Sequence, residues 1–548
     1  MMAESSSSAV LGAAALLLLQ RFPKHPNPKY SYGTAGFRFA VDEYSKHVFV
    51  RTGMLAHFRS VYLGNKTVGL CITASHNLAC DNGIKLIDPD GGMLAASWET
   101  LAAKVINAET NEECIRLLLE ICSPSGPSSV LLARDTRPSS EELEACAIQG
   151  VDVWSKTDGT ARSLGLATTP QLHYCVMEGN QLGYVKGRPA TIQGYNDLLV
   201  DSYKMLVKGG SQSSSKWGTM EVDCANGIGG LMFPAIASKL QEEFPTKLFN
   251  QSTDDASKLN FDCGAEFVQK GQMPPSGCIF SNVNNRRFAS FDGDADRLVC
   301  FYYNNHGFCL LDGDKIASLL TKFIKSQVDL LFGLDQTKTT IGTVQTAYAN
   351  GSSTAYLRNV LGVEVPFVKT GVKHLHHQAQ NYDVGVYFES NGHGTVLFRP
   401  SFIDRVSKTA AGGERLMGLI RLLNQATGDA MADLLAIDGI LRLLGLSYQD
   451  WNEIYLDLPS KQVKVPVKDR NVIQVSEDET RCVSLPELQL ILDQAMSRVE
   501  SGRVFVRPSG TENVIRVYAE AKTQQDADLL AQIAKQAIED LCNKRIKV

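Results

Sequence analysis

The sequence predicts an α/β protein of several domains with largely parallel sheets, followed by a smaller α+β domain at the C-terminus. The chain of 548 residues is too long for one hydrophobic core and corresponds to about three to five domains. Short apolar runs alternate with longer helical patterns through most of the chain, which is typical of layered α/β folds. Near the C-terminus, two strand-like runs instead flank a tight loop and precede one helix.

Five short apolar runs predict buried strands, because each is bounded by polar or turn-forming residues. They span residues 67–72, 130–133, 220–222, 298–303 and 384–388. Residues 140–151 and 314–331 predict helices. No repeat is visible in the residue identities, although similar α/β units could still recur in the structure.

The C-terminal part predicts strands at residues 504–506 and 514–521, and then a helix capped by Thr523, with Asp526 three residues later. One apolar stripe along this helix is formed by Ala527, Leu530, Ala534, Ala537 and Leu541. Segments rich in Gly, Ser, Pro or polar residues predict surface connections. They span residues 123–129, 208–216 and 459–469.

Composition and charge indicate an ordinary globular protein. Apolar residues make up 44% and charged residues 21% of the chain, and the net charge is −5. Such a balance argues against a nucleic-acid partner and a membrane-surface partner, which usually require a basic excess. The 13 cysteines are scattered and form no Cys-x-x-Cys pair. We therefore expect reduced, mostly buried thiols and a cytoplasmic location.

The apolar run from Ala9 to Gln20 needs a separate interpretation, because it resembles the core of a signal peptide. No Lys or Arg precedes it, and it is too short to span a bilayer. The serines before it could cap a helix, and Pro23 could end one. We therefore favour a short docked helix over a targeting signal.

The first loop that contains candidate catalytic residues is Thr73–Asn77, directly after a predicted strand. Ser75 offers a hydroxyl beside His76, and Lys85 follows nearby, a combination that suits nucleophilic or phosphoryl-accepting work. A turn with polar caps is an equally good interpretation of this short motif by itself.

The second loop contains Asp292, Asp294 and Asp296 between two predicted strands. Three carboxylates brought together would repel one another strongly without a cation, and oxygen-only ligation is typical of Mg²⁺. An EF-hand loop also begins with alternating acidic residues, but here Arg297 rather than glycine follows the third one. A solvated acidic turn is the less favoured alternative.

The third loop, Glu389–Gly394, follows another predicted strand. Glu389 and Asn391 could hydrogen-bond vicinal sugar hydroxyls, and the glycines would let a ligand approach the backbone. A glycine turn with polar side chains remains the alternative.

The fourth loop, Arg507–Thr511, lies between the two C-terminal strands, and Arg516 follows it. Arg507 could bind phosphate bidentately, while Ser509, Thr511 and backbone N–H groups supply neutral donors. A turn with a structural arginine is the alternative. Taken together, the four loops describe a phosphosugar and a mobile phosphoryl group held between several domains.

The motifs TASHN, DGDADR, the Glu/Gly sugar loop and RPSGT resemble, in order, the four active-site loops of the α-D-phosphohexomutases. The resemblance covers nearly the full chain. Within that family, four motifs are most similar to the branch that acts on N-acetylglucosamine phosphates. They are Tyr32–Arg38, Gln345–Gly351, Thr370–His377 and Phe388–Gly394. Asn391 is the residue that favours an N-acetyl sugar.

The resemblance implies the four-domain phosphohexomutase architecture, with three α/β domains and a smaller α+β C-terminal domain around a central cleft. The expected domains are residues 1–190 with the phosphoserine loop, 191–303 with the metal loop, 304–447 with the sugar loop and 448–548 with the phosphate loop.

The activity implied is interconversion of N-acetylglucosamine 6-phosphate and N-acetylglucosamine 1-phosphate, a step towards UDP-N-acetylglucosamine. Mg²⁺ and N-acetylglucosamine 1,6-bisphosphate, as intermediate or activator, would be the cofactors. A phosphoglucomutase or phosphomannomutase, a non-catalytic sugar-phosphate sensor and a metal-dependent phosphatase stay open as alternatives. We expect a small-molecule phosphosugar as the partner and a monomer in preference to a dimer.

On this interpretation Ser75 carries the phosphoryl group and binds the metal together with Asp292, Asp294 and Asp296. Lys85 is the candidate general acid/base, and crowding by Arg38 could depress its pKa. Arg38 and His76 are further catalytic candidates, and His76 is expected to be neutral. The expected substrate-binding residues are Arg297, Thr370, Lys373, Glu389, Asn391, Gly392, His393, Arg507, Ser509, Gly510, Thr511 and Arg516.

The chain departs from the family pattern at several positions near these loops. The departures are Leu78, Ala133, Ser390 and Asn513. None removes a nucleophile, a metal ligand or an arginine. Asn513 stands where the family has an aspartate, and it puts phosphate affinity in question.

Overall fold

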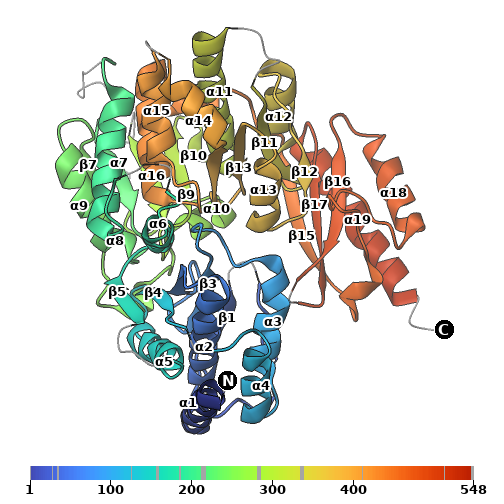
Figure 1. Cartoon of the computed structure of the whole chain (residues 1–548). Helices are drawn as coiled ribbons and strands as arrows, with labels where there is room; N and C mark the ends of the chain where they lie inside the picture. The colour runs from blue at the N-terminus through green and yellow to red at the C-terminus, as the bar shows by residue number, and fades with distance from the viewer. Residues whose placement is uncertain are drawn as a thin grey trace. The chain divides into compact units, whose positions relative to one another are not determined.

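The computed structural model describes residues 2–544 except 28, 34–35, 125, 156–159, 184, 186, 211–217, 280–285, 334–338, 410–411 and 511. The chain divides into two compact units. The first comprises Met1–Asp312 and Val406–Tyr448, and the second comprises Gly313–Arg405 and Gln449–Val548. Each unit contains two β-sheets (Figure 1).

Both sheets of the first unit have five strands. One has the order β1-β3-β2-β4-β5, and the other has the order β10-β9-β8-β6-β7. The first sheet consists of β1 (Phe37–Ala40), β2 (Thr67–Ile72), β3 (Asp81–Ile87), β4 (Ser129–Arg134) and β5 (Ala161–Leu166). The second consists of β6 (Met220–Asp223), β7 (Thr246–Phe249), β8 (Arg287–Phe291), β9 (Leu298–Asn304) and β10 (Gly307–Leu311).

The second unit has a four-stranded sheet of order β12-β11-β13-β14 and a three-stranded sheet of order β15-β17-β16. The larger sheet consists of β11 (Ile341–Thr346), β12 (Phe367–Val368), β13 (Val384–Phe388) and β14 (Gly394–Phe398). The smaller sheet consists of β15 (Ser460–Pro466), β16 (Arg503–Pro508) and β17 (Val514–Glu520).

Helices cover the sheets of both units (Figure 1). In the first unit they are α1 (Met2–Arg21), α2 (Lys46–Tyr62), α3 (Ala96–Asn107), α4 (Asn111–Leu119), α5 (Ser140–Asp152), α6 (Thr169–Gly179), α7 (Ile192–Val207), α8 (Gly229–Met232), α9 (Pro234–Ala237), α10 (Ala265–Gly271), α15 (Gly413–Leu422) and α16 (Ala430–Leu444). In the second they are α11 (Gly313–Phe332), α12 (Gly351–Ala355), α13 (Val372–Ala379), α18 (Pro486–Met496) and α19 (Gln524–Lys544). Unit boundaries fall within α14 (Pro400–Ser407) and α17 (Tyr448–Asn452).

Three of the sheets share one pattern of strand pairing. In each, two successive parallel pairings are followed by an antiparallel one: β5-β4-β2-β3, β7-β6-β8-β9 and β12-β11-β13-β14. The fourth sheet is entirely antiparallel. The predicted architecture of three α/β domains and a smaller α+β domain is confirmed. The expectation of largely parallel sheets is wrong, because every sheet contains a hairpin whose apolar strands look the same in sequence.

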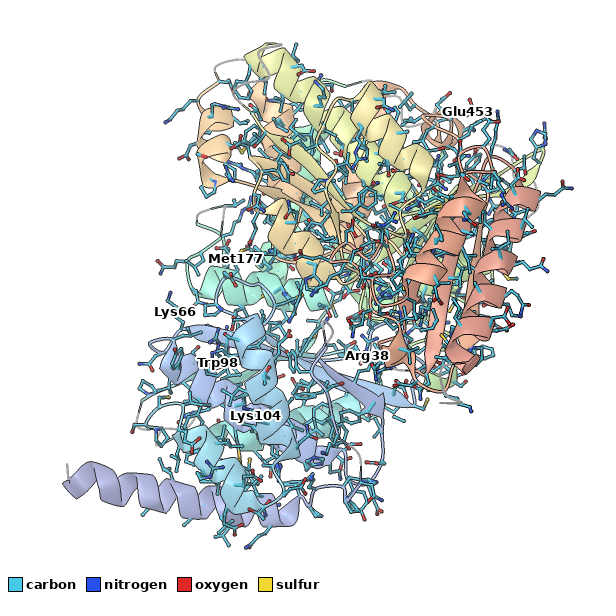
Figure 2. All side chains as sticks on the ribbon, turned by 90° about the vertical axis from the view of Figure 1, so that its right-hand side faces the viewer. Arg38, Lys66, Trp98, Lys104, Met177 and Glu453 are labelled. Carbon is cyan, nitrogen blue, oxygen red and sulfur yellow. The ribbon has the colours of Figure 1, made fainter. Side chains whose placement is uncertain are left out.

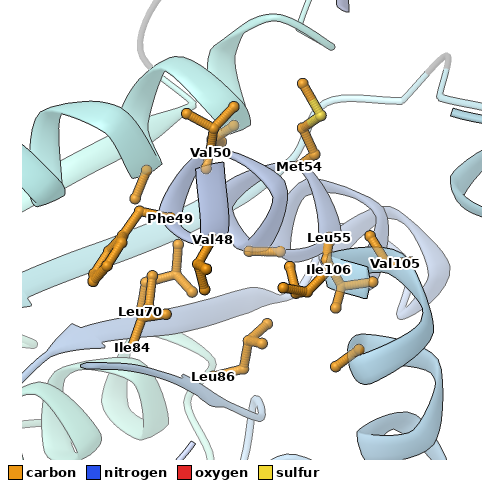
Figure 3. Packing of buried hydrophobic residues seen from close by; sticks show 14 of the residues in the cluster. Val48, Phe49, Val50, Met54, Leu55, Leu70, Ile84, Leu86, Val105 and Ile106 are labelled. Atoms are coloured by element: carbon orange, nitrogen blue, oxygen red, sulfur yellow. The ribbon is translucent and has the colours of Figure 1, made fainter. Parts of the chain in front are cut away.

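The core around α2 shows how the first sheet is stabilised. Val48 and Phe49 of this helix face Leu70 and Ile84 of the sheet, and all four side chains are fully buried (Figure 3). Burying such side chains contributes roughly 1.5–3 kcal/mol each. On another face α2 lies against α5, where a Cβ added at Gly53 would lie 2.1 Å from the Ala147 carbonyl oxygen. Glycine is therefore required for the close approach of the two helices.

The predicted strands and helices form close to their expected bounds, with two corrections. Residues 460–466, expected to be a connection, form strand β15, whose backbone pairs with β17 while most of its side chains stay exposed. A polar edge strand lacks the apolar pattern by which strands are detected.

The second correction concerns the N-terminus. Helix α1 begins at Met2, so the serines lie within it and do not cap it. Ala15 and Leu19 are buried, as expected for a docked helix, and α1 ends two residues before Pro23. Among the residues that the structure describes, none of the helices has the length and apolar character needed to cross a bilayer.

Candidate active site

Ser75 occupies the hairpin loop between β2 and β3. Its backbone φ is 51°, in the left-handed region that non-glycine residues seldom adopt. The Ser75 N–H donates to Thr73 Oγ1 at 2.9 Å, and the Thr73 hydroxyl donates to Asp135 Oδ2 at 2.7 Å. Only 2% of the Ser75 surface is exposed. The loop is thus held by local hydrogen bonds in an unfavourable conformation, which is common at functional sites.

The loop between β8 and β9 brings three carboxylates together. Ligand oxygens of Asp292, Asp294 and Asp296 all lie within 4.8 Å of one another, and the three residues are buried. Ala295 has a φ of 57°, and this turn of the backbone lets the alternate side chains converge. Three buried oxygen ligands suit a hard divalent cation such as Mg²⁺. Burial, followed by the charges of Asp296 and Asp294, raises the pKa of Asp292 well above its usual range.

The serine loop and the acidic loop meet directly. The Ser75 hydroxyl donates to Asp292 Oδ2 at 2.9 Å, although the two residues are far apart in the sequence. The acidic cluster is held further by Thr169, whose Oγ1 donates to Asp294 Oδ2 at 2.7 Å. A nucleophilic hydroxyl therefore sits at the edge of a potential cation site.

Lys85 lies beside the same cluster, with its Nζ 3.6 Å from both Asp294 Oδ2 and Asp296 Oδ2. Burial lowers the pKa of this ammonium, but the two carboxylates raise it by more, so that the pKa lies above its usual value. The predicted depression of the Lys85 pKa by Arg38 is therefore wrong. Acidic partners supplied by another loop outweigh the cationic neighbour.

Arg297, Arg38 and His76 complete this group. Arg297 Nη1 donates to Glu266 Oε2 at 2.6 Å, and Arg38, on β1 (Figure 2), donates from Nη1 to Asn77 Oδ1 at 3.2 Å. Burial and the charge of Arg297 lower the pKa of His76 to about 3, so that the imidazole is neutral at pH 7, as expected.

In the second unit, Arg507 and Thr370 share one partner. Arg507 Nε lies 2.9 Å from Glu479 Oε1, while Thr370 donates to Glu479 Oε2 from its backbone N–H at 2.9 Å and from its hydroxyl at 2.6 Å. Glu479 itself has a φ of 60°. Sequence reasoning missed Glu479, because nothing in its local pattern indicates which residues it contacts.

The loop between β13 and β14 is organised by its own hydrogen bonds. Asn391 Oδ1 accepts from the His393 N–H at 3.0 Å, and Asn391 Nδ2 donates to Glu389 Oε2 at 3.5 Å. Gly392 has a φ of 85°, which requires glycine at this turn. Glu389 and Asn391 are half-buried, so both can still meet a ligand.

The other predicted substrate residues lie on the fourth loop and on α13. Ser509 is buried, and its N–H donates to the Val514 carbonyl at 2.9 Å. Gly510 is exposed, and Arg516 Nη2 lies 3.8 Å from Glu512 Oε2. Lys373 lies in the first turn of α13, and Thr511 lies outside the described residues. Of the predicted substrate residues that the structure describes, Arg297 lies in the first unit and the others lie in the second.

Sequence reasoning also missed two residues that hold the Ser75 loop. Arg137 follows β4, and Asn260 precedes α10; both donate hydrogen bonds to the carbonyl oxygens of Ser75 and Asn77. The run Arg134–Pro138, directly after a predicted strand, could have pointed to Arg137. No comparable local signal exists for Asn260.

Comparison with known protein families places all four parts of the chain in one group. The descriptions that match are "Phosphoacetylglucosamine mutase AMG1, domain II" at residues 188–299 and "domain III" at residues 312–446. The phosphoglucomutase/phosphomannomutase α/β/α domain I matches residues 41–113, and the C-terminal domain of that family matches residues 463–537.

Individual relatives agree with these matches. The chain is 46% identical over 517 residues to a phosphoacetylglucosamine mutase of Sus scrofa, covering 91% of this chain and 92% of the relative. An Aspergillus fumigatus N-acetylphosphoglucosamine mutase, solved in complex with GlcNAc-6P and magnesium, is 38% identical with a TM-score of 0.92, covering 97% and 99% of the two chains. A variant of that fungal protein was solved with glucose 1,6-bisphosphate and has a TM-score of 0.89, at 38% identity and the same coverage.

Proposed function

Because this chain belongs to the phosphoacetylglucosamine mutase family, we propose that it interconverts N-acetylglucosamine 6-phosphate and N-acetylglucosamine 1-phosphate. The enzyme is then an intramolecular phosphotransferase, an isomerase by overall reaction. The observation that carries the proposal is the buried Ser75 hydroxyl, which donates to Asp292 within a cluster of three carboxylates.

We propose Mg²⁺ as the ion held by Asp292, Asp294 and Asp296, with Ser75 as a fourth oxygen ligand. The donor set contains only oxygen, and its buried like charges need a cation for balance. When bound, the ion supplies charge neutralisation for the phosphoryl group. The magnesium complex of the Aspergillus relative supports the same choice of metal.

Phosphoryl transfer would use Ser75 as a reversible carrier. In one direction the phosphorus–oxygen bond to Ser75 breaks, a bond to the free sugar hydroxyl forms, and the proton of that hydroxyl is released while Ser75 regains one. The product is N-acetylglucosamine 1,6-bisphosphate. Its return reaction places the other phosphate on Ser75 and leaves the isomerised monophosphate. Phosphate-ester cleavage is very slow without catalysis, so alignment and charge stabilisation dominate.

Lys85 remains our candidate for proton transfer. The side chain is a charged ammonium at neutral pH and so holds the proton that the departing Ser75 oxygen needs, although its raised pKa makes it a weaker acid. Arg38 and Arg297 would add charge-assisted contacts to the phosphoryl group. His76, which is neutral, would act only through hydrogen bonding.

Substrate recognition would fall to the second unit. We propose that Arg507, Ser509, Gly510, Thr511 and Arg516 bind the phosphate that is not being transferred. Glu389 and Asn391 would bind hydroxyls available in both orientations of the sugar, with Gly392 and His393 shaping the loop, and Thr370 and Lys373 would contribute further substrate contacts. The bisphosphate must turn over between the two half-reactions, so a site that recognises only phosphate can accept either end.

The proposal also includes the domain bounds, the cellular location and the oligomeric state that the sequence predicts. The segments 1–190, 191–303, 304–447 and 448–548 would each supply one active-site loop. The enzyme would act in the cytoplasm, as a monomer, on the route to UDP-N-acetylglucosamine.

The decisive experiment combines mass spectrometry with a coupled assay. We expect a phosphate on the peptide that contains Ser75 and turnover with N-acetylglucosamine phosphates in preference to glucose or mannose phosphates. Ser75→Ala should abolish turnover while sugar-phosphate binding persists. A clear preference for glucose 1-phosphate would indicate a phosphoglucomutase, and stoichiometric release of free phosphate would indicate a phosphatase. A wild-type protein that binds but never turns over would be a sensor.

A further inference from the structure

Two side chains from different parts of the first unit bind the same two backbone carbonyls. Arg137 Nη2 donates to the Ser75 oxygen at 2.9 Å and to the Asn77 oxygen at 2.8 Å. Asn260 Nδ2 donates to the same Ser75 and Asn77 oxygens, at 2.9 Å each. Each nitrogen carries two hydrogens, one for each carbonyl. We call these four hydrogen bonds the carbonyl clamp.

The clamp acts on the residue whose conformation matters most. Ser75 has left-handed backbone dihedrals, which an L-residue adopts only when its surroundings hold it there. A relaxed loop would turn the Ser75 side chain away from Asp292 Oδ2, to which it now donates. The clamp therefore sets the direction of the hydroxyl through the backbone, without touching the oxygen that reacts.

Asn260 also contacts the acidic loop. A Cβ built on Gly293, between two of the carboxylates, would lie 2.7 Å from Asn260 Nδ2 and 2.5 Å from the Ser75 oxygen. The backbone of Asn260 is itself left-handed, with a φ of 55°, and its N–H donates to the Ala225 carbonyl at 3.0 Å. The amide nitrogen of Asn260 thus packs between the Ser75 loop and the loop that carries the three aspartates.

On the basis of the proposed function, we propose that Asn260 is a positioning residue for phosphoryl transfer at Ser75. During the reaction Ser75 alternates between a neutral hydroxyl and a phosphate ester that carries a charge of about −1.5 to −2. Such a change would pull an unrestrained loop to different positions in the two states. A neutral amide that grips backbone carbonyls keeps the loop in one place through both.

Arg137 is a poorer probe of the clamp than Asn260. Its Nε lies 2.9 Å from Asp135 Oδ2, and both side chains are almost fully buried. Removing Arg137 would leave a buried carboxylate without its ion pair, which would reduce the stability of the fold for reasons unrelated to transfer. Asn260 is uncharged and half-buried, so its replacement by glycine leaves no charge uncompensated.

The experiment compares Asn260→Gly, Asn260→Asp and Asn65→Gly with the wild-type enzyme. Glycine tolerates the left-handed backbone but removes the donor, whereas aspartate keeps the shape and places carboxylate oxygens against carbonyl oxygens. Asn65 is the matched control, because it is an exposed asparagine with a φ of 66° after α2. Thermal unfolding and circular dichroism verify that each variant folds.

We expect Asn260→Gly to lower kcat about tenfold and to leave KM for N-acetylglucosamine 6-phosphate within about twofold, because the loss affects the transfer step. Asn260→Asp should lower kcat further, and Asn65→Gly should match the wild type. Rapid-quench measurement of transfer from the phosphorylated enzyme should fall in parallel with kcat.

Wild-type kcat in the Asn260 variants, or a higher KM with unchanged kcat, would overturn the positioning role. If Asn260→Gly does not fold, the isosteric Asn260→Asp variant decides by the same criteria. A wild-type protein that shows no mutase turnover overturns the proposed function itself, which separates that failure from a failure of the role of Asn260.

Discussion

Asp292 shows, at the scale of one residue, how a catalytic site can oppose stability. Its side chain is fully buried, and one of its carboxylate oxygens lies within 4.8 Å of a carboxylate oxygen of Asp294 and of Asp296. Burial and the charges of Asp296 and Asp294 raise the pKa of Asp292 well above its usual range. Like charges in a buried cluster destabilise the fold when no cation is bound, and a bound cation reverses the sign of that effect.

We therefore expect Asp292→Asn to unfold at a higher temperature than the wild type in the presence of EDTA, because the substitution removes one of three buried like charges. Added Mg²⁺ should stabilise the wild type strongly and the variant weakly, while the variant loses turnover. Differential scanning fluorimetry with and without Mg²⁺ measures both effects. Asp254→Asn, at an exposed position, is the control. A variant less stable than the wild type in EDTA would contradict the like-charge argument.

Residue chemistry could be predicted from the sequence wherever it is local. Three aspartates at alternate positions predict a cation site without any tertiary information. The pKa of Lys85 could not be predicted in the same way, because it depends on Asp294 and Asp296, which only the fold brings to within 3.6 Å of its ammonium.

At the scale of elements, α2 contains two fully buried histidines, His47 and His57. Burial lowers the pKa of each to about 4; Arg51 and Lys24 lower that of His47 further, while hydrogen bonds to the Tyr44 and Pro124 backbones act in the opposite direction. In the unfolded chain both would titrate near the usual 6.5. Between these values the unfolded state binds more protons than the folded state.

The free energy of unfolding should therefore decrease as the pH falls from 6.5 towards 4, by about 3 kcal/mol for each of the two residues. Urea denaturation across this range measures the slope. His47→Gln should reduce the slope, whereas His306→Gln, at an exposed hairpin position, should leave it unchanged. An equal slope in His47→Gln and the wild type would refute the assignment.

The turn that carries Glu479, between the bridged residues Val475 and Cys482, has a second testable role. Because one carboxylate anchors both Arg507 and Thr370, Glu479→Gln should loosen the predicted phosphate and substrate contacts together. We expect KM to rise about tenfold with little change in kcat, the signature of lost ground-state binding. Steady-state kinetics with Glu477→Gln as the exposed neighbouring control tests this. A fall in kcat alone would exclude the anchoring role.

At the scale of the whole molecule, each of the four proposed active-site loops connects two strands of an antiparallel hairpin. In three of them the hairpin follows two parallel pairings, so one supersecondary unit recurs without a visible sequence repeat. Each repeat presents a loop at the end of a buried strand, where a rigid scaffold can position side chains. The loops differ in chemistry, and the pairing of the strands shows a repeat that the residue identities do not.

Nine of the 13 cysteines are buried, and the scattered sequence pattern predicts that all of them are reduced thiols. Titration with a thiol reagent should therefore find 13 reactive groups in denaturant without reductant. In the native protein Cys80, which is exposed, should react first, followed more slowly by the half-buried Cys122, Cys278 and Cys309. Fewer than 13 thiols in fresh denatured protein would contradict the fully reduced state.

The sequence by itself determined the order of the four loops and the chemistry of each, because their functional groups lie within a few residues of one another. Only the tertiary structure decided how the loops are held. Asn260 binds the Ser75 loop and Glu479 binds Arg507 through hydrogen bonds and ion pairs between residues distant in the sequence. Such contacts depend on packing and backbone direction, which no local pattern encodes.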